Sequence, residues 1–236
     1  MIVRVCERAL AARNVARVLV ATDDERIRDA VRAAGYEALM TRADHASGSD
    51  RLAEAAATLE DSFDIIVNVQ GDEPQISPRT IERAVAALWD DTEAACATTC
   101  EAVGGVRDVL SADVVKVVSD ARGHALYFSR SPIPYPRDAV RKFGSLAAAL
   151  EVEPALLATF RKHTGLYVYR RAFLLEYARW PQSALERVES LEQLRMLEHG
   201  AKIRVVETGE RSIGVDTPED LERVRALFAA DTLKER

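Results

Sequence analysis

Long apolar runs, a basic surplus and a high cysteine count are all missing from this sequence of 236 residues. No apolar stretch approaches the roughly 20 residues of a membrane-spanning helix, and charges interrupt the first residues too early for a signal peptide. The formal net charge of −6 argues against a nucleic-acid partner, because phosphate backbones are bound by a surplus of Lys and Arg. These absences predict a cytoplasmic protein that binds neither membranes nor nucleic acids.

Cysteine is scarce, and its three positions do not suggest a metal site. Cys6, Cys96 and Cys100 give an odd count, which fits a reducing compartment. Cys96 and Cys100 lie four apart in a stretch that reads as a strand, where they share a face but lie roughly 13 Å from each other. No His stands beside them. We therefore expect free thiols and no cysteine-bound metal.

What the sequence does contain is the composition of an ordinary globular protein, with 48% hydrophobic and 30% charged residues. Its length fits one α/β domain or two small ones, and we favour a single domain over residues 1–236 with an inserted lobe at about residues 120–180. No internal repeat or low-complexity segment divides the chain. We expect one body.

Short apolar runs alternate with amphipathic helices through the first ninety residues. We predict strands over 16–24 and 64–70, and helices over 25–37, 50–60 and 77–90. Ser77 is placed as the N-cap of the last helix and Pro78 as its first residue. Residues 114–130 read as a hairpin, and strands and helices then continue to the end. The alternation predicts a mostly parallel sheet with helices on both faces.

Two acids stand where open sheets bind their ligands. Asp72 follows the apolar run "DIIVNV", and Asp216 precedes a Thr-Pro helix start in "GVDTPEDL". Ordinary turn and cap chemistry explains either acid taken alone. Taken together, two carboxylates at strand ends suit Mg²⁺, which proteins hold by one or two carboxylates plus substrate phosphates.

Six segments stand in the order and approximate spacing of the 3-deoxy-manno-octulosonate (Kdo) cytidylyltransferases, and they span nearly the whole chain: "MTRADHASGSDRLAEA", "VNVQGDEP", "ALYFSRSPIPY", "HTGLYVYR", "LEQLRMLEHG" and "GVDTPEDLERVR". The resemblance implies a Rossmann-like nucleotidyltransferase fold whose inserted lobe forms a homodimer. It also implies a reaction in which CTP and Kdo give CMP-Kdo and pyrophosphate for lipopolysaccharide synthesis, with Mg²⁺ as cofactor.

The same resemblance implies roles for single residues. Asp72 and Asp216 match the catalytic aspartates that bind the metal in the family. The positions that contact Kdo correspond to Gln70, Arg130, His163, Tyr167, Glu192 and Gln193. The nucleotide-binding loop corresponds to Ser47, Gly48 and Asp50. Each residue also has an ordinary structural interpretation, such as a loop and helix cap for "SGSD" or a structural strand histidine for His163.

Two other functions stay open at this point. One is a synthetase that acts on a related keto acid, such as a sialic acid. The other is a nucleotide-binding homologue without catalysis, retained for dimer contacts. Pyrophosphate release from CTP and Kdo would separate the enzyme from the non-catalytic protein.

The beginning of the chain departs from the family pattern. Members open with a strand and a loop resembling "IPARYxSxRLPGKPL", whose Arg and Lys hold the triphosphate, whereas "MIVRV" resembles the segment after that loop. A start assigned to an internal Met, a truncation and a degenerate copy all fit this departure. The family's first strand lies between the strands that match "RVLVATD" and "DIIVNVQ". Without it we expect either a gap between these strands or a new pairing of one with the other, and weak CTP binding.

Overall fold

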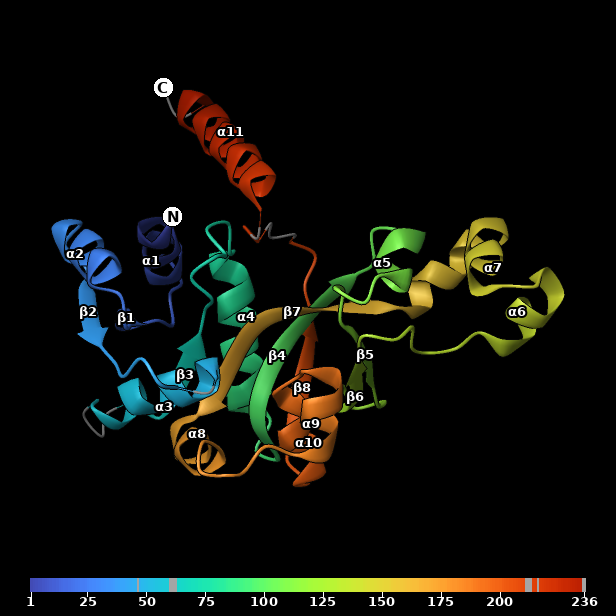
Figure 1. Cartoon of the computed structure of the whole chain (residues 1–236), viewed down its shortest axis with the longest axis horizontal. Helices are drawn as coiled ribbons and strands as arrows, with labels where there is room; N and C mark the ends of the chain where they lie inside the picture. Colours follow the sequence, from blue (N-terminus) through green and yellow to red (C-terminus); the bar gives the residue numbers. More distant parts are fainter. Residues whose placement is uncertain (46, 60–62, 211–213, 216, 235–236) are drawn as a thin grey trace.

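A computed structural model describes residues 1–45, 47–59, 63–210, 214–215 and 217–234 of the chain. Its centre is a six-stranded sheet with helices on both faces, and a two-stranded sheet lies beside it (Figure 1). The small sheet consists of β1 (Leu19–Thr22) and β2 (Glu37–Met40). The strands of the central sheet are β3 (Ile65–Asn68), β4 (Ala94–Ala102), β5 (Lys116–Ser119), β6 (Ala125–Ser129), β7 (Arg161–Arg170) and β8 (Lys202–Glu207).

The strand directions correct one expectation. The central sheet has the order β6-β5-β7-β4-β8, and β3 also pairs with β7. Strand β7 is antiparallel to β3, β4 and β5, whereas β4 and β8 are parallel. The prediction of a mostly parallel sheet is wrong, and the sheet is mixed. The reason is that β7 follows the inserted segment rather than a crossover helix, and parallel neighbours require a crossover connection.

The two strands expected to flank a gap do not pair with each other. β1 and β2 form their own parallel sheet, and β3 belongs to the central one. Of the two alternatives that the sequence left open, the gap is therefore the one found. The N-terminal helix α1 (Ile2–Leu10) lies beside it, and Ile2, Val5, Cys6 and Ala9 line the space between β1 and β3.

Capping confirms the predicted helix starts. Ser77 accepts a hydrogen bond from the Arg79 N–H at the start of α4 (Pro78–Asp90), and Asp24 caps α2 (Glu25–Ala33) in the same way through Arg26. Each cap satisfies a backbone donor that the first helical turn leaves without a partner. The helix predicted near residue 50 is α3 (Gly48–Ala57).

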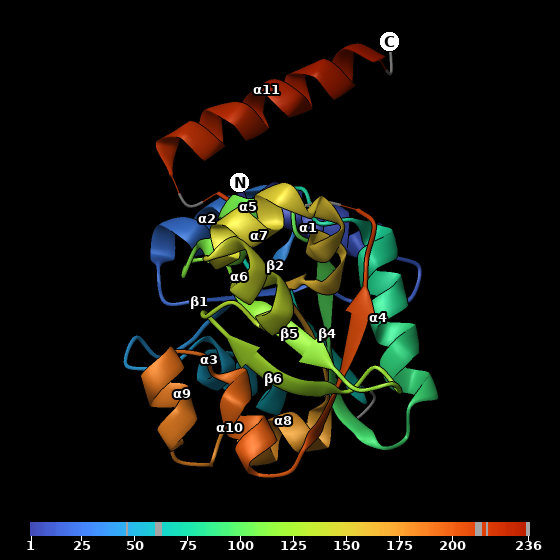
Figure 2. The same cartoon turned by 90° about the vertical axis from the view of Figure 1, so that its right-hand side faces the viewer.

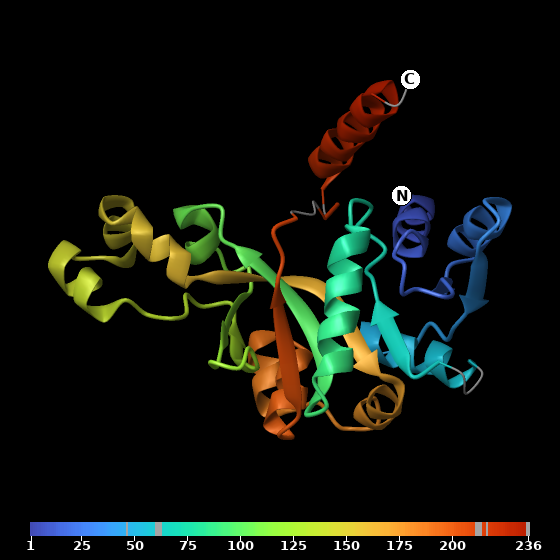
Figure 3. The same ribbon diagram turned by 180° about the vertical axis from the view of Figure 1, so that it is seen from behind.

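Two apolar layers hold the central sheet. On one face α4 packs through Ile81, Ala84 and Leu88 against β4 and β7. Figure 3 shows this helix lying across β4 when the molecule is seen from behind. On the other face α8 (Arg171–Tyr177), α9 (Ala184–Glu189) and α10 (Gln193–Glu198) cover a core of tyrosines and aliphatic side chains. The prediction of helices on both faces is confirmed.

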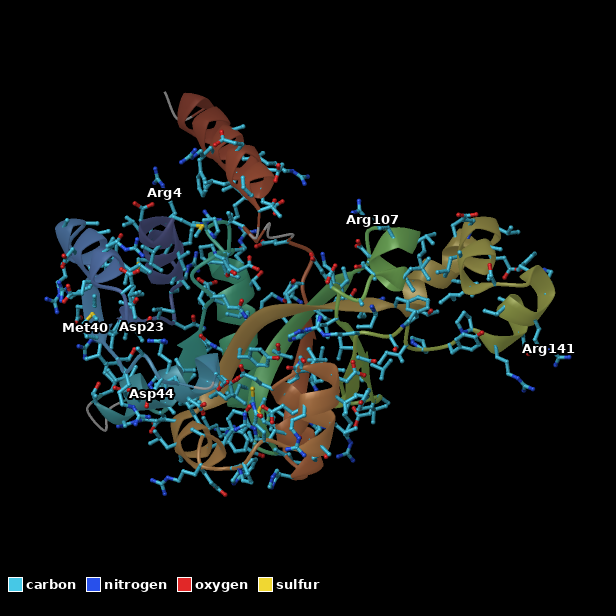
Figure 4. The ribbon with its side chains drawn as sticks, viewed as in Figure 1. Arg4, Asp23, Met40, Asp44, Arg107 and Arg141 are labelled. Atoms are coloured by element: carbon cyan, nitrogen blue, oxygen red, sulfur yellow. The ribbon has the colours of Figure 1, made fainter. Side chains whose placement is uncertain are left out.

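A lobe extends from one end of the body (Figures 1 and 2). It contains α6 (Arg137–Phe143), α7 (Leu146–Val152) and the 3₁₀ helix η1 (Pro154–Thr159), and Arg141 lies at its outer end in Figure 4. A small core of Val103, Val109, Leu150 and Phe160 joins it to α5 (Val106–Leu110). The last helix, α11 (Pro218–Lys234), lies on the side of the N-terminus in Figure 2.

The free thiols expected from the sequence are found. Cys6, Cys96 and Cys100 are all unpaired and buried. Within the described ranges, none of the helices combines the length and the apolar character that crossing a bilayer demands.

Candidate active site

An open cleft of about 1690 Å³ runs from β1 across the carboxyl ends of β3 and β4 to the root of the lobe. It brings together most of the residues predicted from the sequence. Eight of them line it: Gly48, Gln70, Asp72, Arg130, His163, Tyr167, Glu192 and Gln193. Ser47 and Asp50 are not among the described residues that line it, and Asp216 lies outside the residues that the structure describes.

Asp72 lies in the turn that follows β3, and its carboxylate is incompletely paired. The Oδ1 atom is buried and has no hydrogen-bond partner in the described part of the chain. The backbone carbonyl of Asp72 accepts a hydrogen bond from the Val215 N–H at 2.9 Å. A buried carboxylate oxygen without a donor is unfavourable unless a cation approaches it, so this group fits a hard cation such as Mg²⁺. The described residues contain no cluster of three or more metal-ligating side chains.

Gln70 passes close over the backbone of β7. A Cβ atom at Gly165 would stand 2.7 Å from Gln70 Nε2, which is closer than real Cβ atoms come to other atoms, and 3.0 Å from Gln70 Cδ, which is a tight contact. Gly165 therefore leaves the space in which the Gln70 amide lies at the cleft. The sequence prediction had singled out Gln70 but not the glycine that makes room for it.

Replacing Gly165 with Ala is expected to move the Gln70 amide while the fold is kept, because the atoms in the way belong to the end of a flexible side chain. We expect the apparent KM for Kdo to rise about tenfold, the worth of one good hydrogen bond, with the KM for CTP nearly unchanged. Steady-state pyrophosphate release measures both constants. Gln70→Ala is the matched control, and adding Gly165→Ala to it should cost little more. If the increases in KM for Kdo of the two single variants add in the double variant, Gly165 does not act through Gln70.

His163 and Tyr167 share one face of β7, as their spacing predicted. Their ring centroids lie 5.4 Å apart, and the centroids of Phe128 and His163 lie 5.1 Å apart with the two rings nearly perpendicular. Burial lowers the pKa of His163 to about 3, so the imidazole is neutral at physiological pH. Burial also raises the pKa of Tyr167 well above its usual value, so its phenol stays protonated. Both side chains offer neutral hydrogen-bonding groups.

Arg130 lies at the end of β6, where three backbone carbonyls hold its guanidinium. It donates to Glu189 O at 2.8 Å, to Ala112 O at 3.0 Å and to Ser190 O at 3.4 Å. None of these three guanidinium bonds goes to a carboxylate, and the carboxylate of Glu189 accepts the backbone N–H of Arg130 at 2.9 Å instead. Guanidinium groups can bind carboxylates by paired hydrogen bonds, so the chemistry of Arg130 is compatible with the predicted contact to an acidic ligand.

Glu192 and Gln193 meet the cleft at the start of α10. Gln193 is buried, and Glu192 precedes the helix rather than lying within it. Glu192 Oε2 accepts a 2.5 Å hydrogen bond from Ser49 Oγ on α3, and the Glu192 carbonyl accepts one from the Tyr177 hydroxyl at 3.0 Å. Ser49 thus connects the segment expected to bind the nucleotide with the segment expected to bind the sugar. Ser49 lies within "SGSD", but no local pattern marks it as the partner of Glu192.

The residues Ser47 and Asp50 mainly build the start of α3. The Ser47 hydroxyl accepts a hydrogen bond from the Asp50 N–H at 3.2 Å, which is an N-cap. Gly48 and Ser49 follow at the cleft. A nucleotide role for Ser47 and Asp50 therefore stays a prediction.

The basic side chains that line the described part of the cleft are already paired. Arg17 bonds Glu37 at 2.6 Å, and Lys162 bonds Glu101 at 2.7 Å. Arg51 bonds Asp23, which Figure 4 labels at the end of β1, at 3.2 Å. Together with Arg130, these are the cations that the cleft presents. Any polyphosphate must compete with existing partners for them.

The model of the cytidylyltransferase family matches residues 1–203. A 3-deoxy-manno-octulosonate cytidylyltransferase of Syntrophotalea carbinolica is 53% identical over 226 residues, which cover 96% of this chain and 87% of the relative. One from Geobacter sulfurreducens is 51% identical over 224 residues, with 95% and 87% covered. The chain belongs to the 3-deoxy-manno-octulosonate cytidylyltransferase family.

Solved structures agree with this cytidylyltransferase assignment. A CMP:2-keto-3-deoxy-manno-octonic acid synthetase complexed with CTP superposes with a TM-score of 0.85 at 45% identity, covering 98% of this chain and 88% of the other. A 4-diphosphocytidyl-2C-methyl-D-erythritol synthase from Anaerococcus prevotii has a TM-score of 0.58 at 12% identity, and this likeness shows the fold alone. The family resemblance predicted from six sequence segments is confirmed.

Proposed function

We propose that this chain transfers CMP from CTP to Kdo and releases pyrophosphate, making CMP-Kdo for lipopolysaccharide synthesis. The anomeric hydroxyl of Kdo attacks the α-phosphorus of CTP and forms a new P–O bond. The bond between the α-phosphorus and the oxygen that bridges it to the β-phosphorus breaks, and pyrophosphate leaves. The observation that carries the proposal is the cleft itself. In a chain that belongs to this family, the cleft is lined by all six residues that we propose to contact the sugar.

The sugar acid is bound by groups of complementary chemistry. Arg130 takes the carboxylate, since it is the cation held by carbonyls rather than by an acid. His163, Tyr167 and Gln193, which are buried or half-buried, take hydroxyl groups, and Gln70 reaches the same pocket across Gly165. Glu192, held by Ser49, completes the set. In these assignments Arg130 contacts the charged carboxylate, and neutral side chains contact hydroxyl groups.

Asp72 and Asp216 are proposed to hold Mg²⁺ together with phosphate oxygens of CTP. The buried, unpartnered Oδ1 of Asp72 supports this, as does the Val215 N–H bond to the Asp72 carbonyl, since Val215 is the sequence neighbour of Asp216. When bound, the ion would neutralise charge that builds on the phosphate oxygens. The task of Asp72 is to keep one carboxylate oxygen free and desolvated at the carboxyl end of β3.

Gly48 and Ser49, with Ser47 and Asp50 behind them, are proposed to form part of the nucleotide site. The support is their place at the first turn of α3, on the wall of the same cleft. We further propose a homodimer formed through the lobe, where Tyr135 and Val152 are each 60% exposed. A cytoplasmic location is supported by the three free thiols.

Pyrophosphate release tests the function directly. Purified chain is incubated with Mg²⁺, CTP and either Kdo or a sialic acid, and pyrophosphate and the nucleotide sugar are quantified. We expect product with Kdo and a much lower rate with the sialic acid. Equal rates with both acids would favour the wider keto-acid specificity. Binding of CTP without any product at high enzyme concentration would favour the non-catalytic homologue.

A further inference from the structure

Thr98 is a fully buried polar residue on β4 whose hydroxyl lies among groups of the sugar pocket. Its Oγ1 atom is 2.8 Å from Leu166 O, 2.9 Å from His163 Nε2 and 3.5 Å from Thr164 O. The ladder between β4 and β7 shifts register between Thr98 and Thr99, which marks a bulge. The threonine hydroxyl therefore lies between an irregular backbone segment and the imidazole.

The hydroxyl of Thr98 has a single proton, and its shortest contact is the one to Leu166 O, well inside the 3.5 Å contact to Thr164 O. A carbonyl oxygen cannot donate, so the 2.8 Å contact between Thr98 Oγ1 and Leu166 O requires the hydroxyl proton between them. Nothing is left for Thr98 to give to His163. The 2.9 Å contact between Oγ1 and Nε2 must then be a hydrogen bond that the imidazole donates.

This assignment fixes the other ring nitrogen. A neutral imidazole carries one N–H, and burial holds the pKa of His163 near 3, so the ring is neutral. With the proton on Nε2, Nδ1 is a bare acceptor. No hydrogen bond to Nδ1 is found from the residues that the structure describes, and the His163 side chain lines the cleft.

We propose that Thr98 is a positioning residue that locks His163 in the Nε2–H form, so that Nδ1 accepts a hydrogen bond from a hydroxyl group of the sugar acid. The inference rests on the proposed function, because the sugar acid is the ligand in question. It assigns His163 a definite chemistry: the residue selects a hydroxyl donor and contributes nothing to carboxylate recognition.

Two substitutions test whether the Thr98 hydroxyl fixes the tautomer of His163. Thr98→Val keeps the shape but removes the hydroxyl, and Thr98→Ser keeps the hydroxyl and is the matched control. We expect the Kd for Kdo, measured by calorimetry in the presence and absence of CTP, to rise about tenfold in Thr98→Val and to stay within about twofold in Thr98→Ser. The Kd for CTP should change less than about twofold in both. A general loss of structure would weaken both ligands.

The tautomer is measured in the unaltered protein by ¹⁵N NMR of labelled histidine, with His163→Ala used to assign the signal. We expect a protonated Nε2, an unprotonated Nδ1, and a shift of the Nδ1 signal when Kdo is added. An Nδ1–H tautomer overturns the inference, and so does a Thr98→Val protein that binds Kdo normally. The tautomer measurement decides the question even where the Thr98→Val protein does not fold. Pyrophosphate release with an Nδ1–H tautomer contradicts only this inference. An Nε2–H tautomer without Kdo binding or product contradicts the proposed function and the hydroxyl contact with it.

Discussion

Changing Asp72 to Asn is expected to slow CMP transfer about a thousandfold, which corresponds to roughly 4 kcal/mol of transition-state stabilisation. The amide keeps the size of the side chain but removes the negative charge at the position where Oδ1 is buried without a partner. Folding should be spared or slightly improved, since a neutral oxygen is easier to bury than a charged one. Single-turnover rates of pyrophosphate release at saturating CTP measure the chemical step.

Asp64→Asn provides the matched control for this experiment. Asp64 precedes β3 at the opposite end of the same strand, and its side chain is exposed. The same chemical change there should alter the rate less than about twofold. Raising the Mg²⁺ concentration should recover part of the lost rate in Asp72→Asn, because one ligand and not the whole site is removed. A variant with near-normal turnover in limiting Mg²⁺ would remove Asp72 from the metal site.

Before residue 90, local patterns in the sequence predicted most of the elements but missed α1 and β2, and they did not predict the strand directions. The strand and helix alternation before residue 90 gave β1, α2, α3, β3 and α4 at about their observed positions, because period and capping residues are local properties. The short strand β2 was missed, since "YEALM" is too short and mixed to show a period. The direction of β7 depends on how the chain returns from the lobe, and no local pattern encodes that.

In the candidate site, too, some residues could be predicted from local sequence and others could not. Side chains that would touch ligand could be matched to family motifs, and the structure places most of them around one cleft. The residues that hold them could not be found in this way. Ser49 bonds Glu192 across 143 positions of sequence, and Thr98 bonds His163 across 65. In "CATTC", Thr98 looks like any buried strand threonine, because its partner is known only once β4 and β7 are paired.

The gap between β1 and β3 leads to the prediction with the widest consequences. Among the described residues, β1 pairs with β2 alone and β3 with β7 alone, so each presents an open strand edge to the cleft. The wall between these edges is apolar, with Val18, Val20, Ile65 and Val67 among its residues. Open edges and apolar walls are both stabilised by an inserted strand. The cleft should therefore accept one extended apolar segment.

The experiment supplies that segment and separates its two effects. A strand and loop of the family pattern "IPARYxSxRLPGKPL" is fused ahead of Met1, and a matched segment carries Gln at each Arg and Lys. We expect both fusions to raise the Tm by about 5–10 °C, or roughly 2–3 kcal/mol for a chain of this length, because both can pair with β1 and β3. Only the basic segment should tighten CTP binding, by about tenfold or more, since the cations already at the cleft are engaged by Glu37, Asp23, Glu101 and backbone carbonyls.

Calorimetry with CTP and Mg²⁺ measures the change in CTP affinity, and thermal unfolding measures the change in Tm. Equal CTP affinity in both fusions would mean that side chains of the chain itself exchange their partners for the triphosphate, and an unchanged Tm would mean that the strand does not enter the gap.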